Sequence, residues 1–228
     1  MSTAHYDVLA TLVAYPGPEF EADVTRAIAL HAEFYPRAAQ RLEQLQRLLP
    51  TEDLVALQAL YMRTFDIQPI TSLDVGYTLF GEDYKRGAIL ANLNSEHQRA
   101  GNDCGGQLAD HLPNVLRLLP KLTDVALRDE LVKLLLAPAL QAMISEFDPA
   151  PLAKKEELYQ KHHKAVLEVA VGDMRTAYRH ALAAILEVLR EDFGLRASLP
   201  VVQESRFLGA VDAEMQIESQ ESSDVGGM

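Results

Sequence analysis

The chain has 228 residues, of which 48% are apolar, and its formal net charge at pH 7 is -12. No basic patch is dense enough to follow a phosphate backbone, which argues against a nucleic-acid partner. The single cysteine, Cys104, excludes a disulfide within the chain and a cysteine-based zinc site.

Membrane-spanning and export signals are also missing from the sequence. No uninterrupted apolar run reaches the roughly 18–20 residues that a membrane span needs. The first residues, Met1 to Asp7, lack the positive region and apolar core of a signal peptide. We therefore expect a cytoplasmic protein without direct membrane insertion, and its acidic balance is compatible with a basic peptide as partner.

The N-terminal quarter has the apolar spacing of consecutive helices. Residues 5–15 predict a first helix, residues 18–31 a second and residues 36–49 a third, separated by prolines and a glycine. Thr51 is the expected N-cap of a fourth helix. The apolar face of that helix should carry Leu54, Leu57, Tyr61 and Phe65.

The next stretch mixes aromatic, charged, glycine and proline residues. Pro69 should end the fourth helix, because proline removes a backbone donor and clashes with the preceding turn. Residues 72–80 predict a short helix, residues 81–83 a turn, and residues 83–100 a longer helix. Any specific function is expected in this part of the chain.

A loop and two further helices follow. Asp110 is the expected N-cap of the first helix, with Pro113 tolerated in its first turn. Residues 124–147 predict the second, kinked or divided at Pro138. Residues 152–192 then predict a long helical segment.

That segment should be broken near Gly172 and end at a C-cap, Gly194. After it, acidic and small polar residues dominate, so we expect residues 198–228 to be a disordered acidic tail. Strand signals are weak, and residues 198–202 are the only candidate. The predicted fold is all-α, a single-domain helical bundle over residues 1–197.

Common catalytic and metal-binding motifs are absent from the sequence. No histidine follows a glutamate by three residues, no two histidines are four apart, and no glycine-rich phosphate loop occurs. The sequence places no activating histidine next to Ser72, and partners from elsewhere in the chain stay an open question. Nothing near Cys104 would lower the pKa of its thiol. We therefore expect no metal, no cofactor and no catalytic residue.

A recognition surface remains as the favoured function. Aromatic side chains could line a groove for an apolar helix, with carboxylates at its rim for a basic side chain. The aromatic candidates are Tyr61, Phe65 and Tyr77, and the acidic candidates are Asp66, Asp83 and Asp110. Plain structural alternatives stay open, because aromatic residues at helical spacing usually belong to a core. Asp110-His111 could equally be a helix cap with a surface histidine, and Arg86 a structural ion pair.

Several of these residues form motifs that occur in one known family. In chain order they are Tyr61-x-x-x-Phe65-Asp66, Ser72-Leu73 with Tyr77, Gly81-Glu82-Asp83-x-x-Arg86-Gly87, Ala100-Gly101 and Asp110-His111-Leu112-Pro113. With this order and spacing, residues 5–190 resemble the NarJ family. Its members are assembly chaperones of respiratory nitrate reductase, within the wider TorD/DmsD group of redox-enzyme maturation proteins.

The resemblance implies an all-helical protein without catalytic turnover, either a monomer or a weak dimer. Its expected partner is the catalytic molybdenum subunit of a respiratory oxidoreductase, bound through the N-terminal leader peptide of that subunit. The chaperone would hold the subunit ready for cofactor insertion before membrane attachment or export. By position, the resemblance assigns leader binding to Tyr61, Phe65, Asp66, Tyr77, Arg86, Asp110, His111 and Pro113.

The chain also departs from the family pattern. Family members often have proline where this chain has Ala109, and basic residues where it has Tyr84 and Lys85. The client enzyme is therefore open among nitrate reductase and related molybdenum enzymes. Two other functions stay open: a small helical hydrolase or nucleotide-binding enzyme with its site in residues 61–113, and an adaptor acting through its tail.

Overall fold

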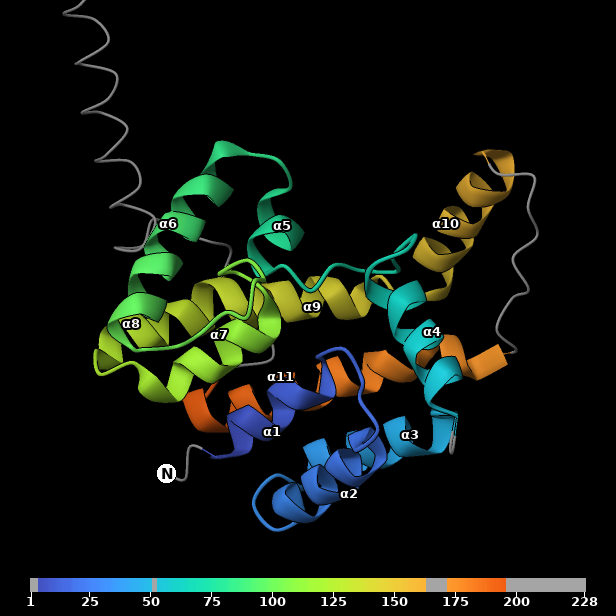
Figure 1. Ribbon diagram of the computed structural model, residues 1–228, viewed down its shortest axis with the longest axis horizontal. Helices are drawn as coiled ribbons and strands as arrows, with labels where there is room; N and C mark the ends of the chain where they lie inside the picture. The colour runs from blue at the N-terminus through green and yellow to red at the C-terminus, as the bar shows by residue number, and fades with distance from the viewer. Residues whose placement is uncertain (1–3, 51–52, 163–171, 196–228) are drawn as a thin grey trace, which may run out of the picture.

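The computed structural model describes residues 4–50, 53–162 and 172–195 of the chain. These residues form an all-α fold, which confirms the predicted fold class (Figure 1). The β-structure found among them is one isolated antiparallel bridge between Asp74 and His111. None of the helices in this part of the chain is long and apolar enough to cross a membrane.

Eleven α-helices are found in the described part of the chain. They are α1 (Ala4–Leu12), α2 (Phe20–His31), α3 (Pro36–Leu48), α4 (Leu54–Phe65), α5 (Val75–Phe80), α6 (Tyr84–Arg99) and α7 (Leu112–Leu118), then α8 (Val125–Glu130), α9 (Ala137–Ser145), α10 (Pro149–His162) and α11 (Ala177–Phe193). Three shorter turns join them: the 3₁₀ turns η1 (Leu119–Lys121) and η3 (Gly172–Thr176), and the π-helical turn η2 (Leu131–Leu136).

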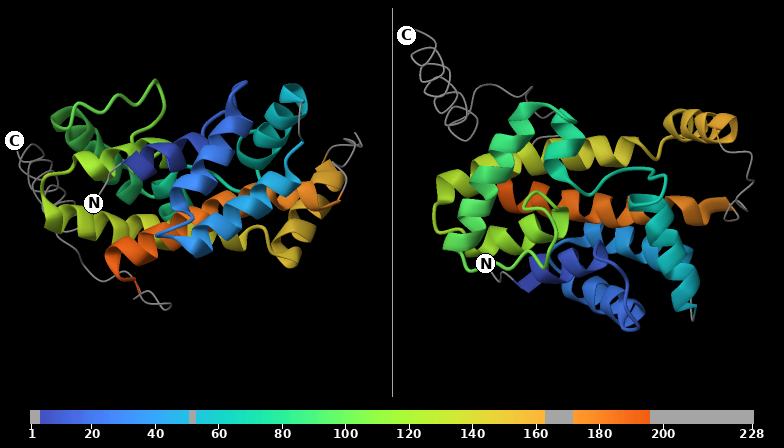
Figure 2. Two further views of the ribbon diagram at one scale, coloured as in Figure 1. Left: turned by 90° about the horizontal axis from the view of Figure 1, so that it is seen from below. Right: turned by 45° about the horizontal axis from the view of Figure 1, so that its top comes forward.

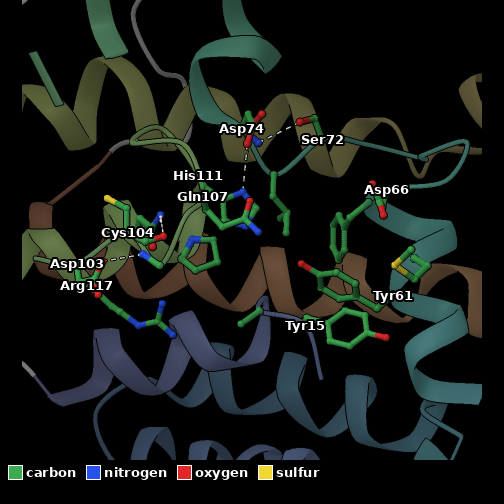
Figure 3. A pocket seen from close by; sticks show the side chains of 17 residues that line it. Tyr15, Tyr61, Asp66, Ser72, Asp74, Asp103, Cys104, Gln107, His111 and Arg117 are labelled. Carbon is green, nitrogen blue, oxygen red and sulfur yellow. Dashed lines mark hydrogen bonds and ion pairs between the residues drawn. The ribbon is translucent and has the colours of Figure 1, made fainter. Parts of the chain in front are cut away.

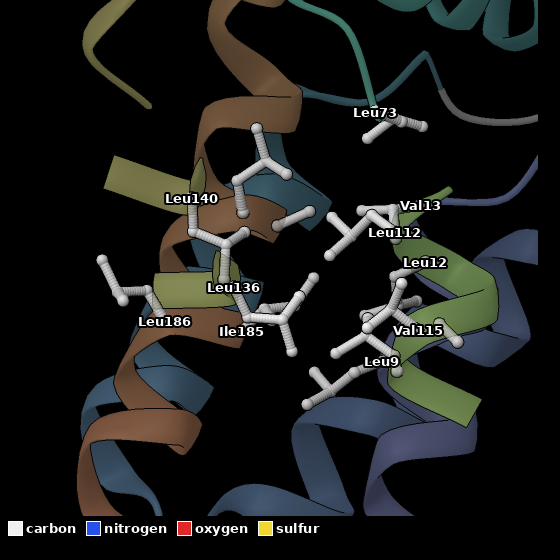
Figure 4. Packing of buried hydrophobic residues seen from close by; sticks show 14 of the residues in the cluster. Leu9, Leu12, Val13, Leu73, Leu112, Val115, Leu136, Leu140, Ile185 and Leu186 are labelled. Carbon is white, nitrogen blue, oxygen red and sulfur yellow. The ribbon is translucent and has the colours of Figure 1, made fainter. Parts of the chain in front are cut away.

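Helix α11 is the centre of the packing. It lies between α3 and α9, and α1 packs against both α2 and α7 (Figures 1 and 2). One face of α11 is buried, because Tyr178, Leu182 and Ile185 on it are fully buried. Figure 4 shows the meeting of α11, α9, α1 and α7 through Ile185, Leu186, Leu140, Leu9, Leu12, Leu112 and Val115.

Several helix ends differ from the prediction. α1 ends at Leu12, short of residue 15, and α2 begins at Phe20, two residues after Pro18. Thr51, the expected N-cap of the fourth helix, lies outside the described residues. The N-cap of α4 is Asp53, whose carboxylate accepts the Ala56 N–H at 2.9 Å. Gly194, in contrast, caps α11 as predicted, with a left-handed φ of 58° that favours glycine.

The predicted division at Pro138 falls slightly earlier in the chain. Residues 125–145 run on through α8, η2 and α9, and the irregular part is the π-helical turn before Pro138. The Ala137 N–H there donates to the Val132 carbonyl, five residues back. Proline supplies no N–H to the turn before it, so a wider turn at this point fits the sequence.

A polar cluster joins the start of the chain to the end of α11. The Asp192 carboxylate accepts hydrogen bonds from the Tyr6 and Tyr35 hydroxyls, each at 2.6 Å, and contacts His5 Nε2 at 2.9 Å. Burial opposes ionisation of Asp192, but the bonds from His5, Tyr35 and Tyr6 outweigh it and hold its pKa below the ordinary value. The cluster therefore ties α1 and the start of α3 to α11.

Two further predictions concern residues that the structure does not describe. The acidic tail at 198–228, with its strand candidate at 198–202, lies outside the described residues. So does the stretch 163–171 of the predicted long helix. The break near Gly172 is at the edge of the described part, where η3 begins.

Candidate functional site

A pocket of about 560 Å³ opens between the end of α4 and the loop that precedes α7 (Figure 3). It is lined by side chains from segments far apart in the sequence. They are Ala14, Tyr15, Tyr61, Met62, Phe65, Asp66, Ser72, Leu73, Asp74, Asp103, Cys104, Gly105, Gln107, His111, Pro113, Asn114 and Arg117. We call this pocket the groove.

One wall of the groove is aromatic. Tyr61 and Phe65 lie one turn apart on α4, so their rings share a face, with centroids 5.0 Å apart. Tyr15, which is 56% exposed, meets Tyr61 edge-on at 5.5 Å. Behind them, the buried Tyr178 ring contacts Tyr61 at 5.7 Å and Phe65 at 5.0 Å. Each such ring pair contributes about 0.5–1.5 kcal/mol, so this wall is a rigid apolar surface.

Tyr61 also carries a hydroxyl that stays protonated at neutral pH. Burial raises its pKa to about 12, and the charges of Asp66 and Asp74 act in the same direction. The hydroxyl donates to the Val13 carbonyl at 3.4 Å. The aromatic wall is therefore uncharged, and Tyr61 joins α4 to the end of α1.

The opposite wall is polar and centres on Asp74 and His111. His111 Nδ1 lies 3.1 Å from Asp74 Oδ1. Main-chain bonds of the β-bridge hold the two residues together, from the Val75 N–H to the Asp110 carbonyl and from the Leu112 N–H to the Leu73 carbonyl. The hydrogen bond from His111 lowers the pKa of Asp74, and the charges of His111 and Arg86 lower it further.

A buried ion-pair network supports this wall from behind. Arg86 donates to Asp74 Oδ2 at 2.9 Å and to Asp110 Oδ2 at 3.3 Å, and its guanidinium lies 5.1 Å from the centre of the Tyr77 ring. Asp110 is 0% exposed and also accepts the Gly76 N–H at 3.1 Å. Burial raises the pKa of Asp110, because its charged form loses hydration that one arginine only partly replaces.

The predicted N-cap role of Asp110 is therefore wrong. His111 occupies the N-cap position of α7 without a capping side-chain bond. The Asp110 carboxylate turns instead into the core, where Gly76 and Arg86 bind it. The Asp110 carboxylate thus joins the loop before α7 to α5 and α6. The spacing of residues within one helix cannot predict such a tertiary contact.

The loop before α7 has its own buried support. Asn102 donates to His97 Nδ1 at 2.9 Å and to the Asn114 carbonyl, while His97 Nε2 contacts the Ala109 carbonyl at 2.9 Å. Burial lowers the pKa of His97, so the ring is neutral and its proton lies on Nε2. These bonds fix the backbone that carries Asp110 and His111.

The structure divides the eight predicted binding residues into two groups. Five of them line the groove: Tyr61, Phe65, Asp66, His111 and Pro113. The other three, Tyr77, Arg86 and Asp110, form the support behind its polar wall. Asp83, expected at the rim, instead caps α6 by accepting the Lys85 N–H.

Part of the groove lining has no signal in the sequence. Tyr15 lies in the turn after α1, outside any apolar stripe, and Arg117 lies on α7 among buried leucines. Asp74, two residues after Ser72, gives no motif of its own. Only the packing of α1 and α4 near α7 brings these side chains together.

Gly76 lies so close to the ion-pair network that a side chain there would clash with it. A Cβ atom there would lie 2.8 Å from Asp110 Oδ2 and 3.3 Å from Arg86 Cγ. We expect Gly76→Ala to lower the free energy of unfolding by about 1–3 kcal/mol, as overpacking does. Chemical denaturation measures this change.

The matched control is Gly87→Ala on α6, where nothing lies within 4 Å. That change should be stabilising by up to about 1 kcal/mol, because alanine favours a helix interior. Equal stability of the Gly76→Ala protein and the wild type would contradict the close approach.

Comparisons with known proteins add no family assignment. No family model matches the chain, and no curated protein sequence matches it. Within residues 4–50, 53–162 and 172–195, no group of three or more His, Cys, Asp or Glu side chains is arranged to hold a metal ion.

Proposed function

We propose that the protein is a cytoplasmic assembly chaperone for a molybdopterin oxidoreductase, of the NarJ type within the TorD/DmsD group. It binds the N-terminal leader of the catalytic subunit of nitrate reductase or a related enzyme. It keeps that subunit competent for cofactor insertion before membrane attachment or export. The groove is the observation that carries the proposal, because one lining joins Tyr61, Phe65 and Asp66 at the end of α4 with His111 and Pro113.

The shape and chemistry of the groove suit a peptide. Its volume of about 560 Å³ lies within the range of ligand pockets, which is roughly 300–1,000 Å³. The aromatic wall supplies apolar contact area, and the charged side chains around it supply orientation. A short amphipathic helix presents this combination of apolar and charged groups.

The proposed chaperone acts through a difference in its affinity for two forms of the catalytic subunit. The chaperone binds the cofactor-free subunit better than the finished one, so it leaves when the cofactor is in place. A leader that becomes ordered on binding loses conformational entropy. We therefore expect micromolar or submicromolar affinity, tight enough to hold the client and weak enough to release it.

Calorimetric titration tests the proposal. The ligand is a synthetic peptide with the leader sequence of the molybdenum enzyme encoded beside this protein, and a scrambled peptide is the control. We expect saturable one-to-one binding of the leader alone. A folded protein that binds neither peptide would contradict the proposal.

His111→Ala should weaken leader binding about tenfold, since His111 faces the groove and orders Asp74 beside it. Helicity should be unchanged, because no side-chain bond of His111 caps α7. Circular dichroism measures the helicity, and the leader titration measures the affinity. His180→Ala on α11, away from the groove lining, is the control and should keep wild-type affinity.

A hydrolase is the second candidate, favoured by one specific arrangement. Ser72, His111 and Asp74 line the same groove, and Asp74 contacts His111 Nδ1 as the acid of a catalytic triad does. Ser72 Oγ, however, accepts the Asp74 N–H at 3.0 Å, and Arg86 occupies the second oxygen of Asp74. In this structure the serine and the histidine are not linked by a hydrogen bond.

A serine-directed fluorophosphonate probe separates the two candidates. A hydrolase would be labelled at Ser72, and Ser72→Ala would abolish the label. A chaperone gives no label under conditions in which a known serine hydrolase is labelled fully. Leader binding by an unlabelled protein would therefore favour the chaperone.

A further inference from the structure

Two side chains of opposite charge line the groove and use their charge nowhere else in the described part of the chain. Arg117, half-buried in the last turn of α7, has no hydrogen-bond or ion-pair partner for its guanidinium among these residues. Asp66, directly after α4, has none for its carboxylate in the same part of the chain. Figure 3 shows them on opposite sides of the groove, with His111 between them.

The other ionisable groups of the lining differ in how far they are engaged. Asp74 is paired with Arg86 and His111. Asp103 is exposed and accepts the Gly105 N–H at 2.9 Å. Burial, together with the charge of Asp103, raises the pKa of the Cys104 thiol, which stays neutral. Arg117 is therefore the cation of the lining that a bound molecule could pair with, and Asp66 is the carboxylate that adjoins Phe65 on the aromatic wall.

The apolar part of the groove is not central. Tyr15 and Tyr61 lie on the Asp66 side of the groove in Figure 3, away from Arg117. The Phe65 ring packs against Tyr61, with centroids 5.0 Å apart, and completes this aromatic wall. A ligand that fills the groove therefore meets a cation first, then the polar His111 side, then an aromatic surface with a carboxylate beside it.

We infer that the groove reads a peptide segment of defined charge order: an acidic side chain at Arg117, and a large apolar side chain on the Tyr15–Tyr61–Phe65 wall with a basic side chain next to it at Asp66. This inference rests on the proposed function and states what kind of leader segment the groove accepts. A segment docked in reverse places like charges together, which is costly, so the two charges fix direction.

Designed peptides test the charge order directly. Each is a synthetic helical 16-residue peptide with one apolar cluster, one glutamate at one end and one arginine beside the cluster. Companions replace the glutamate by glutamine, the arginine by glutamine, or both. All four are titrated into the full-length protein, beside the leader peptide used above. We expect each neutral replacement to weaken binding about tenfold.

Protein variants then locate each charge. Arg117→Gln should weaken binding of the parent peptide about tenfold and leave the glutamine-for-glutamate peptide unaffected. Asp66→Asn should likewise weaken binding of the parent peptide about tenfold and leave the glutamine-for-arginine peptide unaffected. Arg117→Glu should restore binding to a peptide with lysine in place of the glutamate. Matched controls are Arg37→Gln and Asp7→Asn, exposed charges outside the groove lining that should change nothing.

The outcomes separate the two claims. Peptide binding with additive, uncoupled effects in these cycles would overturn the charge order and leave the chaperone proposal in place. Coupled effects with the designed peptides, without binding of the leader, would support the charge order and count against the chosen client. If the folded protein binds no peptide at all, both the inference and the proposed function are wrong.

Discussion

Asp110→Ala should lower the free energy of unfolding by about 3 kcal/mol, because it removes one partner of a buried ion pair. The Asp110 carboxylate is fully buried and accepts from both Gly76 and Arg86. Without it, the Gly76 N–H loses its acceptor and Arg86 keeps only Asp74. For a chain of this length the melting temperature should fall by roughly 6–12 °C.

The control for this variant is Glu82→Ala, an exposed carboxylate in the turn before α6. Its melting temperature should stay within about 2 °C of the wild type, as surface changes usually do. Equal melting temperatures for Asp110→Ala and Glu82→Ala would contradict the buried network. Such a result would mean that the Asp110 carboxylate contributes no more to stability than an exposed one.

Asp192→Ala is the second change with a large expected effect, again about 3 kcal/mol. It leaves the Tyr6 and Tyr35 hydroxyls and the His5 ring without their common acceptor. His5 and Tyr6 are buried and Tyr35 is half-buried, so water replaces the lost bonds incompletely. Urea denaturation measures the loss, and Asp7→Ala on the exposed side of α1 is the control.

The same carboxylate predicts a pH dependence. Because the pKa of Asp192 is below its ordinary value of 3.8 in the folded chain, the unfolded chain binds more protons in acid. Its stabilising contribution is therefore present above about pH 4 and lost as the pH falls through the folded pKa. The stability gap between wild type and Asp192→Ala should shrink below pH 4, and a constant gap would contradict the assignment.

Periodicity predicted the helices well because burial in this fold follows single helix faces. α11 covers the end of the predicted helical segment 152–192, buries Tyr178, Leu182 and Ile185 on one face, and is capped by Gly194 as predicted. Helix starts were less certain, because nearby capping residues compete: Asp53, two residues after Thr51, caps α4.

The site was harder to predict, because its residues act through tertiary contacts. The sequence around Asp110 predicts a helix cap, but its carboxylate is buried and accepts hydrogen bonds from Arg86 on α6 and Gly76 on α5. Tyr77 was predicted to line the groove, and its ring instead lies against the Arg86 guanidinium. No single-helix pattern contains these pairings, since each joins residues from different segments of the chain.

Affinity for two forms of the client tests the chaperone account most directly. The purified protein is titrated with the full catalytic subunit of the molybdenum enzyme encoded beside it, once free of cofactor and once loaded. We expect at least about tenfold tighter binding of the cofactor-free subunit, and loss of that preference when the leader is removed. Equal affinity for the two forms would contradict it, because such binding could not delay an unfinished enzyme selectively.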